Sequence, residues 1–342
     1  MTQNKGVVTS VKTLAALCLL ACFAACAFSQ DEGDLIAKKR LFPGVGPGLR
    51  AVKRGADGNF YILSAPGSTA TVFDPAGKLL RRVPEYDESK APAAASAQLT
   101  SIVYGEDMDV DAQGTVYVAD RGANAVKIWD AKGNERVIKV NSPVSVAALP
   151  DGEVAVATVH GDHLVVVFDK NGRDVREFGD PEPISESPEV NRFLNIGMMV
   201  TDGAGHLYYA FPYLPEATVR QYDRNGYGGE DIQYTGVDAW PTAQAMRKEI
   251  ERQEKRGDAP VFKRVMTAVG VESATGEVWM ALGNNLLHFD KEGNRRATYK
   301  IYTPQEARLE ATTILIEQNR LIIGSDPLGI YEFERPDKKD QQ

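Results

Sequence analysis

From residue 44 to residue 338 the chain alternates between short apolar runs and turns, and it repeats one pattern six times. Each unit has an apolar run, a turn, a second run rich in β-branched and aromatic residues, a polar loop, a third run ending in an aromatic residue, and an acidic turn. The first turns of the six units contain Gly58, Gly114, Gly152, Gly205, Gly276 and Asn319. Gly and Asn supply the positive φ angles of tight hairpins, so the pattern predicts antiparallel strands.

Five of the six acidic turns share the form aromatic-Asp-x-x-Gly, as in the segments 73–77 and 129–133, and the sixth, 333–337, is a degenerate version. An Asp in such a turn accepts hydrogen bonds from backbone amides that follow it. A small four-stranded meander cannot bury both faces alone, so such units stack around an axis. We therefore predict an all-β fold, a six-bladed β-propeller of four-stranded antiparallel blades over residues 44–338, with a tail at 339–342.

The last unit lacks a good outer strand, because the residues after Phe333 are polar. The segment 30–43, which precedes the first blade, is expected to be a linker and a closing strand for the last blade. Its apolar residues Leu35, Ile36, Leu41 and Phe42 are expected to be buried. Closing the ring in this way would protect both sheet edges.

One short helical insertion is expected near 241–256. We expect Thr242 at its N-cap and Gly257 near its end, with Ala245, Met246 and Ile250 as its apolar anchors. Because its other positions are mostly polar, we expect a solvated helix that lies across one face of the propeller.

The segment 116–133, VYVADRGANAVKIWDAKG, resembles an NHL repeat, whose usual form is an apolar strand, Ala-Asp, a Gly and Asn loop, an apolar strand and Asp-x-x-Gly. The resemblance covers residues 44–338 and implies a six-bladed propeller. The other blades match more loosely, because Asp120 corresponds to Ser64, Thr158, Phe211, Leu282 and Ser325. The resemblance implies a fold more strongly than a function.

The N-terminal segment has the layout of a secretory signal peptide over residues 1–29, with lysines followed by an uncharged apolar stretch. It also holds the chain's three cysteines, Cys18, Cys22 and Cys26. An alternative is a lipoprotein signal that ends at Cys22, which would then be lipidated. We expect an exported protein, periplasmic or secreted, or lipid-anchored at the cell envelope.

The charge and the cysteine content of the chain exclude several classes of function. The formal net charge is −8 and no basic stripe is present, which argues against nucleic-acid binding. The chain beyond Cys26 has no cysteine, which excludes a disulfide framework, a thiolate zinc site and a cysteine nucleophile there. We expect an envelope or extracellular protein, peptide or glycan as the partner of a monomeric chain.

In a propeller, the loops between second and third strands and the crossovers between blades lie on one face, here called the loop face. The opposite face carries the short hairpins and is here called the hairpin face. The long and varied segments belong to the loop face, which makes it the better place for a site. The candidate ligand-binding residues on it are Asp120, Arg121, Asn124, His160, Asp162, His163, Tyr213, Asn284 and Asp326.

Three further groups are candidates. His160 and His163 are weak metal-ligand candidates, since catalytic zinc needs three protein ligands. Glu106, Asp107 and Asp109 could hold a divalent ion such as calcium in the central channel, although solvated turn acids are the favoured interpretation. The aromatic residues that could form a stacking surface are Phe211, Tyr213 and Trp240.

Two function classes follow. The first, which we favour, is a binding scaffold that holds its partner on the loop face, because no catalytic constellation is evident. The alternative is a metal-dependent lactonase-like hydrolase or lyase. The resemblance to six-bladed lactonases implies a metal in the channel held by a Glu of the first inner strand, and the corresponding segment 46–52 has no Glu.

Overall fold

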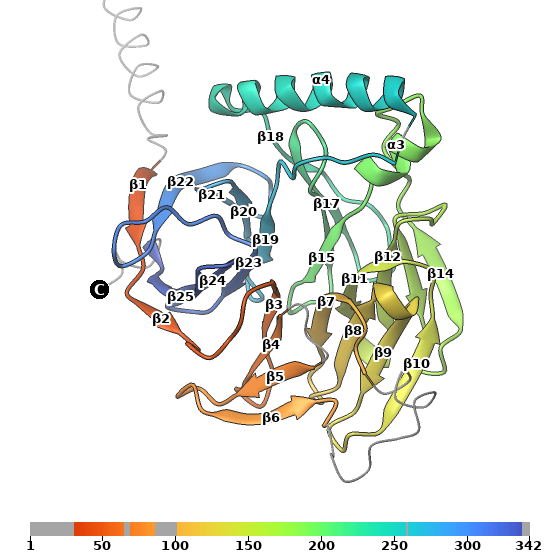
Figure 1. The fold of residues 1–342 in the computed structure, drawn as a ribbon, viewed down its shortest axis with the longest axis vertical. Helices are drawn as coiled ribbons and strands as arrows, with labels where there is room; N and C mark the ends of the chain where they lie inside the picture. Colours follow the sequence, from red (N-terminus) through yellow and green to blue (C-terminus); the bar gives the residue numbers. More distant parts are fainter. Residues whose placement is uncertain (1–30, 65–68, 86–100, 258, 337–342) are drawn as a thin grey trace, which may run out of the picture.

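The computed structural model describes residues 31–64, 69–85, 101–257 and 259–336, and it confirms the propeller. Six sheets surround one axis, and the first strand of each blade is innermost (Figure 1). Six clusters of buried apolar residues fill the six boundaries between neighbouring blades. The hydrophobic core is therefore a ring, and each blade is stabilised by both of its neighbours.

The first three blades are regular meanders. Blade 1 consists of β3 (Leu49–Arg54), β4 (Phe60–Ser64), β5 (Ala70–Phe73) and β6 (Leu79–Val83). Blade 2 consists of β7 (Gly105–Val110), β8 (Val116–Asp120), β9 (Ala125–Trp129) and β10 (Glu135–Lys139). Blade 3 consists of β11 (Pro143–Ala148), β12 (Val154–Thr158), β13 (Val165–Phe168) and β14 (Asp174–Phe178).

The last three blades differ in how their outer edges are completed. Blade 4 consists of β15 (Met198–Thr201), β16 (Leu207–Phe211), β17 (Ala217–Tyr222) and β18 (Ile232–Tyr234). Blade 5 consists of β19 (Ala268–Val271), β20 (Val278–Leu282), β21 (Asn285–Phe289) and β22 (Arg295–Tyr302), and blade 6 of β23 (Thr313–Ile316), β24 (Arg320–Ser325) and β25 (Gly329–Glu334).

The acidic turns have the predicted structure. Oδ1 of Asp74, Asp130, Asp169 and Asp223 accepts hydrogen bonds of 2.8 to 3.0 Å from the amides two and four residues on. The glycines that follow have positive φ, as at Gly133 (83°) and Gly226 (91°). Each turn therefore needs both its Asp and its Gly.

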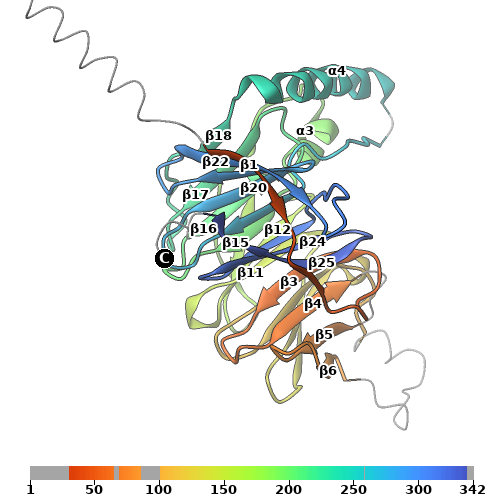
Figure 2. The same ribbon diagram turned by 90° about the vertical axis from the view of Figure 1, so that its left-hand side faces the viewer.

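The N-terminal segment closes the ring, as predicted, and it also joins a second blade. β2 (Lys39–Leu41) pairs antiparallel with β25 and is the outer strand of blade 6. β1 (Asp31–Ile36) pairs parallel with β22 as a fifth strand on blade 5, which we did not predict. Figures 1 and 2 show the two strands running across the outer edges of blades 5 and 6. Leu35 is buried, whereas Ile36 points outward and is 51% exposed, so its predicted burial is wrong.

The insertion after blade 4 forms a helix, α4 (Trp240–Arg256), that ends before Gly257 in the left-handed conformation. Its N-cap is Ala239 rather than Thr242, so the helix begins three residues earlier than that cap predicted, with Pro241 as its second residue, because Pro is favoured in a first helical turn. Ala243, Met246 and Ile250 face the core, and Ala245 is exposed, which corrects one predicted anchor.

Several shorter elements complete the fold. α3 (Pro188–Leu194) was missed, although Ser187 and Pro188 form a standard helix start. The short 3-10 turns are η2 (Arg121–Ala123), η3 (Pro150–Gly152) and η4 (Val237–Ala239). Both views place α4 at the rim beyond blade 4, so the expectation that it lies across one face of the propeller is wrong (Figures 1 and 2). Among the described residues, no helix is long and apolar enough to cross a membrane.

Candidate functional site

The inner strands enclose a central cavity of about 980 Å³. Its wall on blades 1 to 3 carries charged side chains, and its wall on blades 4 to 6 is mostly apolar. The charged lining residues of the first three blades are Arg50, Lys53, Arg54, Glu106, Asp107, Asp109, Asp111, Arg121 and Asp151. A cavity of this size that combines apolar and polar walls has the form of a small-ligand site.

Irregular strand pairing shapes the loop-face end of this cavity. The pairing of β3, β7 and β11 with their neighbours shifts register at Arg50, Glu106 and Val144, one residue into each strand. Such bulges redirect side chains at a strand end. Here they bring Arg50 and Glu106 to the mouth of the cavity.

The two aspartates of β7 point toward blade 3 and bond its inner strand. Asp107 accepts hydrogen bonds from the Ser145 hydroxyl (2.5 Å) and the Val146 amide (3.2 Å), and Asp109 accepts one from the Ala148 amide (2.9 Å). The innermost strand of a blade has no neighbouring strand on its channel side. The backbone amides on that side therefore need acceptors other than a strand. The favoured interpretation of solvated turn acids is therefore wrong for Asp107 and Asp109, which are structural acceptors.

Lys53 supplies the positive charge in this part of the cavity. Its ammonium lies 3.2 Å from Asp109 Oδ1. Burial lowers the pKa of Lys53, but the charges of Asp109 and Asp107 outweigh burial, so the pKa is raised and Lys53 stays protonated. Burial raises the pKa of Asp107. The charge of Lys53 and the hydrogen bonds to Asp107 lower it only in part, so the pKa stays above its ordinary value.

These side chains do not fit a divalent metal. The oxygens of Asp107 and Asp109 are engaged by Lys53, Ser145 and backbone amides. Among the residues that the structure describes, no three or more His, Cys, Asp or Glu side chains are grouped to hold a metal ion. Calcium needs six or more oxygen ligands, and this donor set does not provide them.

The mouth of the cavity on the loop face carries two arginines around one carboxylate. Glu106 Oε1 lies 3.2 Å from Arg121 Nη1, and Glu106 Oε2 lies 3.6 Å from Arg50 Nη1. Arg50 Nη2 also donates a hydrogen bond of 2.6 Å to the hydroxyl of Tyr104, whose ring lies under the guanidinium at 5.3 Å. Tyr104 is 41% exposed, and the Arg121 side chain is 46% exposed. This group, Arg50, Tyr104, Glu106 and Arg121, is here called the mouth cluster.

Of the predicted loop-face residues, Asp120 is a buried brace. It is fully buried and accepts hydrogen bonds from the amides of Val103, Tyr104 and Ala123, with the Lys127 ammonium at 3.2 Å. Asn124 ends η2 in the left-handed conformation, and its side chain accepts a hydrogen bond from the Ser142 amide. Arg121, between these two, is the member of this loop that faces the cavity.

The two histidine candidates lie away from the central cavity, in a separate pocket of about 400 Å³ beside α3. His160 Nδ1 lies 3.5 Å from Arg192, whereas His163 lies 4.0 Å from Glu177 and 3.8 Å from Asp180. Asp162 is exposed between them. The two imidazoles therefore contact different partners.

The remaining candidates are spread over the loop face. Tyr213 lines the cavity and packs on Phe193 with ring centroids 4.9 Å apart. Phe211 is fully buried and Trp240 is 57% exposed on α4, so the predicted three-residue stacking surface does not form. Asp326 also lines the cavity and accepts a hydrogen bond from the Gly48 amide. Asn284 lies between β20 and β21, and its carbonyl accepts a hydrogen bond from the Ile301 amide.

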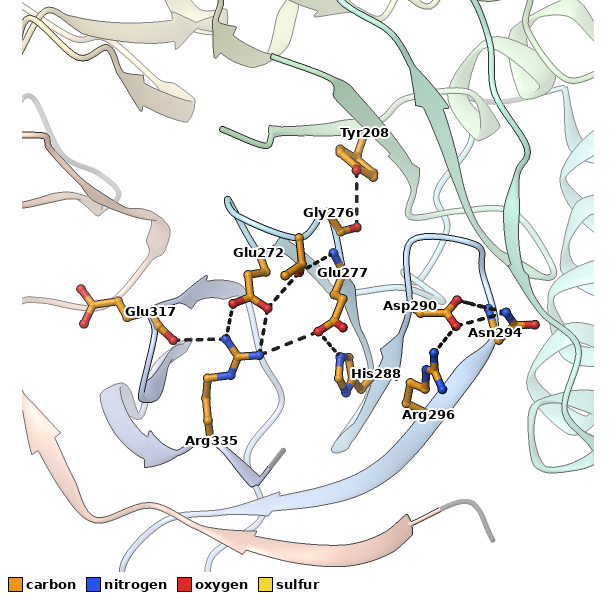
Figure 3. Close-up of polar contacts among 11 residues, drawn as sticks. Tyr208, Glu272, Gly276, Glu277, His288, Asp290, Asn294, Arg296, Glu317 and Arg335 are labelled. Atoms are coloured by element: carbon orange, nitrogen blue, oxygen red, sulfur yellow. Dashed lines mark hydrogen bonds and ion pairs between the residues drawn. The ribbon is translucent and has the colours of Figure 1, made fainter. Parts of the chain in front are cut away.

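A second polar cluster joins blades 5 and 6 (Figure 3). The buried Arg335 guanidinium forms two contacts with Glu272, at 2.7 and 2.9 Å, and lies 3.9 Å from Glu277. His288 Nε2 lies 3.1 Å from Glu277 and its ring stacks on Trp279 at 4.1 Å. Because Arg335 follows the last strand of blade 6 and its carboxylate partners belong to blade 5, the cluster holds these two neighbouring blades together.

No protein-family model and no curated sequence matches the chain. Solved structures match over most of its length. A gluconolactonase from Xanthomonas campestris is 14% identical with a TM-score of 0.54, covering 85% of this chain and 87% of the other. A streptogramin B lyase is 12% identical with a TM-score of 0.52, covering 87% and 86%. The extracellular domain of a candidate one-component system from B. thetaiotaomicron is 11% identical with a TM-score of 0.51, covering 91% of this chain and 34% of the other. These similarities define the class as six-bladed β-propellers.

Proposed function

We propose that this chain is an exported, NHL-like β-propeller that binds a protein, peptide or glycan through its loop face. The observation that carries the proposal is the mouth cluster, in which Arg50, Tyr104 and Arg121 keep exposed polar and aromatic surface at the opening of the central cavity. Arg and Tyr are residues that contribute strongly to binding interfaces. The carboxylates deeper in the cavity are engaged in contacts between blades.

The two faces provide a matched test, because each carries an exposed Tyr and Arg. The loop-face variant combines Tyr104→Ala with Arg121→Glu. The control variant combines Tyr227→Ala with Arg173→Glu, and both residues lie in hairpins between third and fourth strands. Tyr227 is 75% exposed, and so is the side chain of Arg173. Each immobilised protein is used to capture partners from envelope and culture extracts, after thermal unfolding has confirmed that it is folded.

We expect the loop-face variant to lose at least tenfold in captured partner and the control variant to retain capture. Equal capture by both variants, or loss only in the control, contradicts the proposal. Deleting α4 is a poor substitute, because Met246 and Ile250 belong to the apolar core at blades 3 and 4.

A second candidate function is a metal-dependent lactonase-like hydrolase or lyase. It is favoured by the neighbouring carboxylates Asp107 and Asp109 in the cavity wall and by the gluconolactonase and lyase with the same fold. It is disfavoured by the engagement of both carboxylates with Lys53 and the backbone. Elemental analysis of the purified protein separates the candidates, since one bound divalent metal per chain favours the hydrolase.

A further inference from the structure

The mouth cluster has a surplus of positive charge in an otherwise acidic protein. Two guanidinium groups share the single carboxylate of Glu106, and neither contact is bidentate. The exposed Arg264, which precedes β19 on the loop face, also lines the cavity. The loop-face end of the cavity thus has three arginines and two carboxylates, those of Glu106 and Asp326. It is positively charged, whereas the whole chain has a net charge of −8. An incoming anion can therefore share the guanidinium donors that Glu106 leaves available.

The opposite end of the cavity is unsuited to an anion. The turns after the inner strands place Asp111, Asp151, Asp202 and Glu317 there, with Arg54 as a cation beside Glu317 at 3.5 Å. Like charges repel an approaching carboxylate at that end. An anion is therefore directed to the loop face, where the arginines lie.

Apolar side chains line the mouth across from the arginines. Phe193, Ile196, Met198 and Tyr213 belong to blade 4 and its crossover, and all four line the cavity while remaining partly exposed. In a ring of six blades, blade 4 stands opposite blade 1, which carries Arg50. A ligand that bridges the mouth thus meets charge on one side and an apolar surface on the other.

We propose that the mouth cluster binds a carboxylate attached to an apolar group, with the carboxylate at Arg50 and Arg121 and the apolar group against Met198 and Tyr213. This inference rests on the proposed function and specifies the chemistry of its ligand. Two sources share this chemistry, a peptide C-terminus with an apolar last residue and a free amphiphilic acid. A neutral glycan lacks a carboxylate, so identification of such a glycan as the ligand would contradict this inference.

Isothermal titration calorimetry of the whole exported chain at low salt tests the proposal with paired probes. One pair is octanoate and 1-octanol, and the other is an acetylated pentapeptide ending in Leu-Phe as the free acid and as the amide. We expect at least one free acid to bind at least tenfold more tightly than its neutral counterpart, and its binding to weaken as salt is raised. Tighter binding of the peptide acid identifies a peptide C-terminus, and tighter binding of octanoate identifies a free acid.

Variants locate the site. Arg121→Gln and Arg50→Gln are expected to weaken the bound acid at least fivefold, and Met198→Asp is expected to weaken it similarly. Arg173→Gln, the same exchange on the hairpin face, is expected to leave binding within twofold. Equal binding of acid and neutral probes, no binding of either acid, or an unchanged affinity in Arg121→Gln overturns the inference. If neither acid binds but the loop-face variant still loses partner capture, the carboxylate ligand is wrong and the proposed function stands. The two failures are therefore distinguishable.

Discussion

The Asp107 carboxylate of β7 accepts a hydrogen bond of 2.5 Å from the Ser145 hydroxyl of β11, across the boundary between blades 2 and 3. The same hydroxyl accepts a hydrogen bond of 2.9 Å from the Met199 amide of blade 4. Ser145 therefore links three consecutive inner strands through one oxygen atom.

Ser145→Ala is expected to lower the free energy of unfolding by about 1 to 3 kcal/mol, because it leaves the Met199 amide and one Asp107 oxygen without this partner. Chemical denaturation measures the change. Ser142→Ala is the control, because the Ser142 hydroxyl donates an exposed hydrogen bond of 3.3 Å to the Asn141 side chain, and it should change stability by about 0.5 kcal/mol or less. A loss no larger than the control contradicts the linking role.

Lys53 is expected to stabilise the two aspartates of β7 in the cavity wall. Lys53→Met removes the cation beside Asp107 and Asp109, so we expect a loss of about 1 to 3 kcal/mol, reduced from the value for a fully buried pair because both partners keep some solvent contact. Added calcium should leave the melting temperatures of both the wild-type protein and this variant unchanged, because Ser145 and backbone amides still engage Asp107 and Asp109 and the remaining oxygens are too few for calcium. Lys132→Met, on an exposed hairpin, controls for the substitution. A calcium-dependent rise in the melting temperature of the wild-type protein argues for a divalent-metal site in the cavity.

The sequence predicted the repeated parts of this molecule better than its long-range contacts. The Asp and Gly of the acidic turn, such as Asp130 and Gly133, recur in five blades because they are set by local geometry, and together with the first turns they predicted six blades. β1 could not be predicted in the same way, because DEGDLI has no apolar alternation and its pairing with β22 depends on the finished ring.

The site follows the same division. The carboxylates of β7 were recognised as residues of the channel, but their partner Lys53 belongs to the preceding blade and no local pattern connects them. Arg50 and Tyr104 were missed for the same reason, since their contact forms only when blades 1 and 2 pack. The preference of functional sites for loops predicts Arg121, which lines the cavity and contacts Glu106.

Arg335 is expected to stabilise the contact between blades 5 and 6. Arg335→Met leaves Glu272 buried without its bidentate partner, which should cost about 3 to 5 kcal/mol. Adding Glu272→Gln to that variant removes the uncompensated charge and should recover more than half of the loss. Arg296→Met breaks an exposed contact with Asp290 (Figure 3) and should cost about 1 kcal/mol or less. Denaturation curves in which Arg335→Met and Arg296→Met are equal would rule out this role.

The N-terminal strands provide an adjacent pair of matched positions. Leu35 packs into the apolar cluster at blades 5 and 6, whereas Ile36 points outward on the same strand. Leu35→Ala is expected to lower stability by about 2 kcal/mol, at the low end for buried leucines because β1 lies at the edge. Ile36→Ala should change it by about 0.5 kcal/mol or less. Similar effects at the two positions would show that β1 does not hold the ring.

The acidic turns predict how stability depends on pH. Partial burial raises the pKa of Asp290, but hydrogen bonds from Asn294 and the charge of Arg296 outweigh it, so the pKa is lowered. A lowered pKa in the folded state gives stability that is present above the ordinary value of 3.8 and is lost as pH falls through the folded value. Asp290→Asn should therefore lose less stability than the wild type between pH 5 and pH 2, taking up about one proton fewer on unfolding. Asp162→Asn, in an exposed loop, is the control, and an equal acid dependence in wild type and Asp290→Asn would contradict the role of this turn.

The central claim is that the loop face, at the mouth of the cavity, is where this protein meets its ligand. The most direct measurement is photocrosslinking in the cells that make the protein, with Tyr104 or Tyr227 replaced by p-benzoylphenylalanine. Both positions are exposed, at 41% and 75%, and they lie on opposite faces. We predict a discrete crosslinked product from position 104 and none from position 227, despite the greater exposure of the latter. A product from position 227 alone, or equal products from both, would contradict the claim.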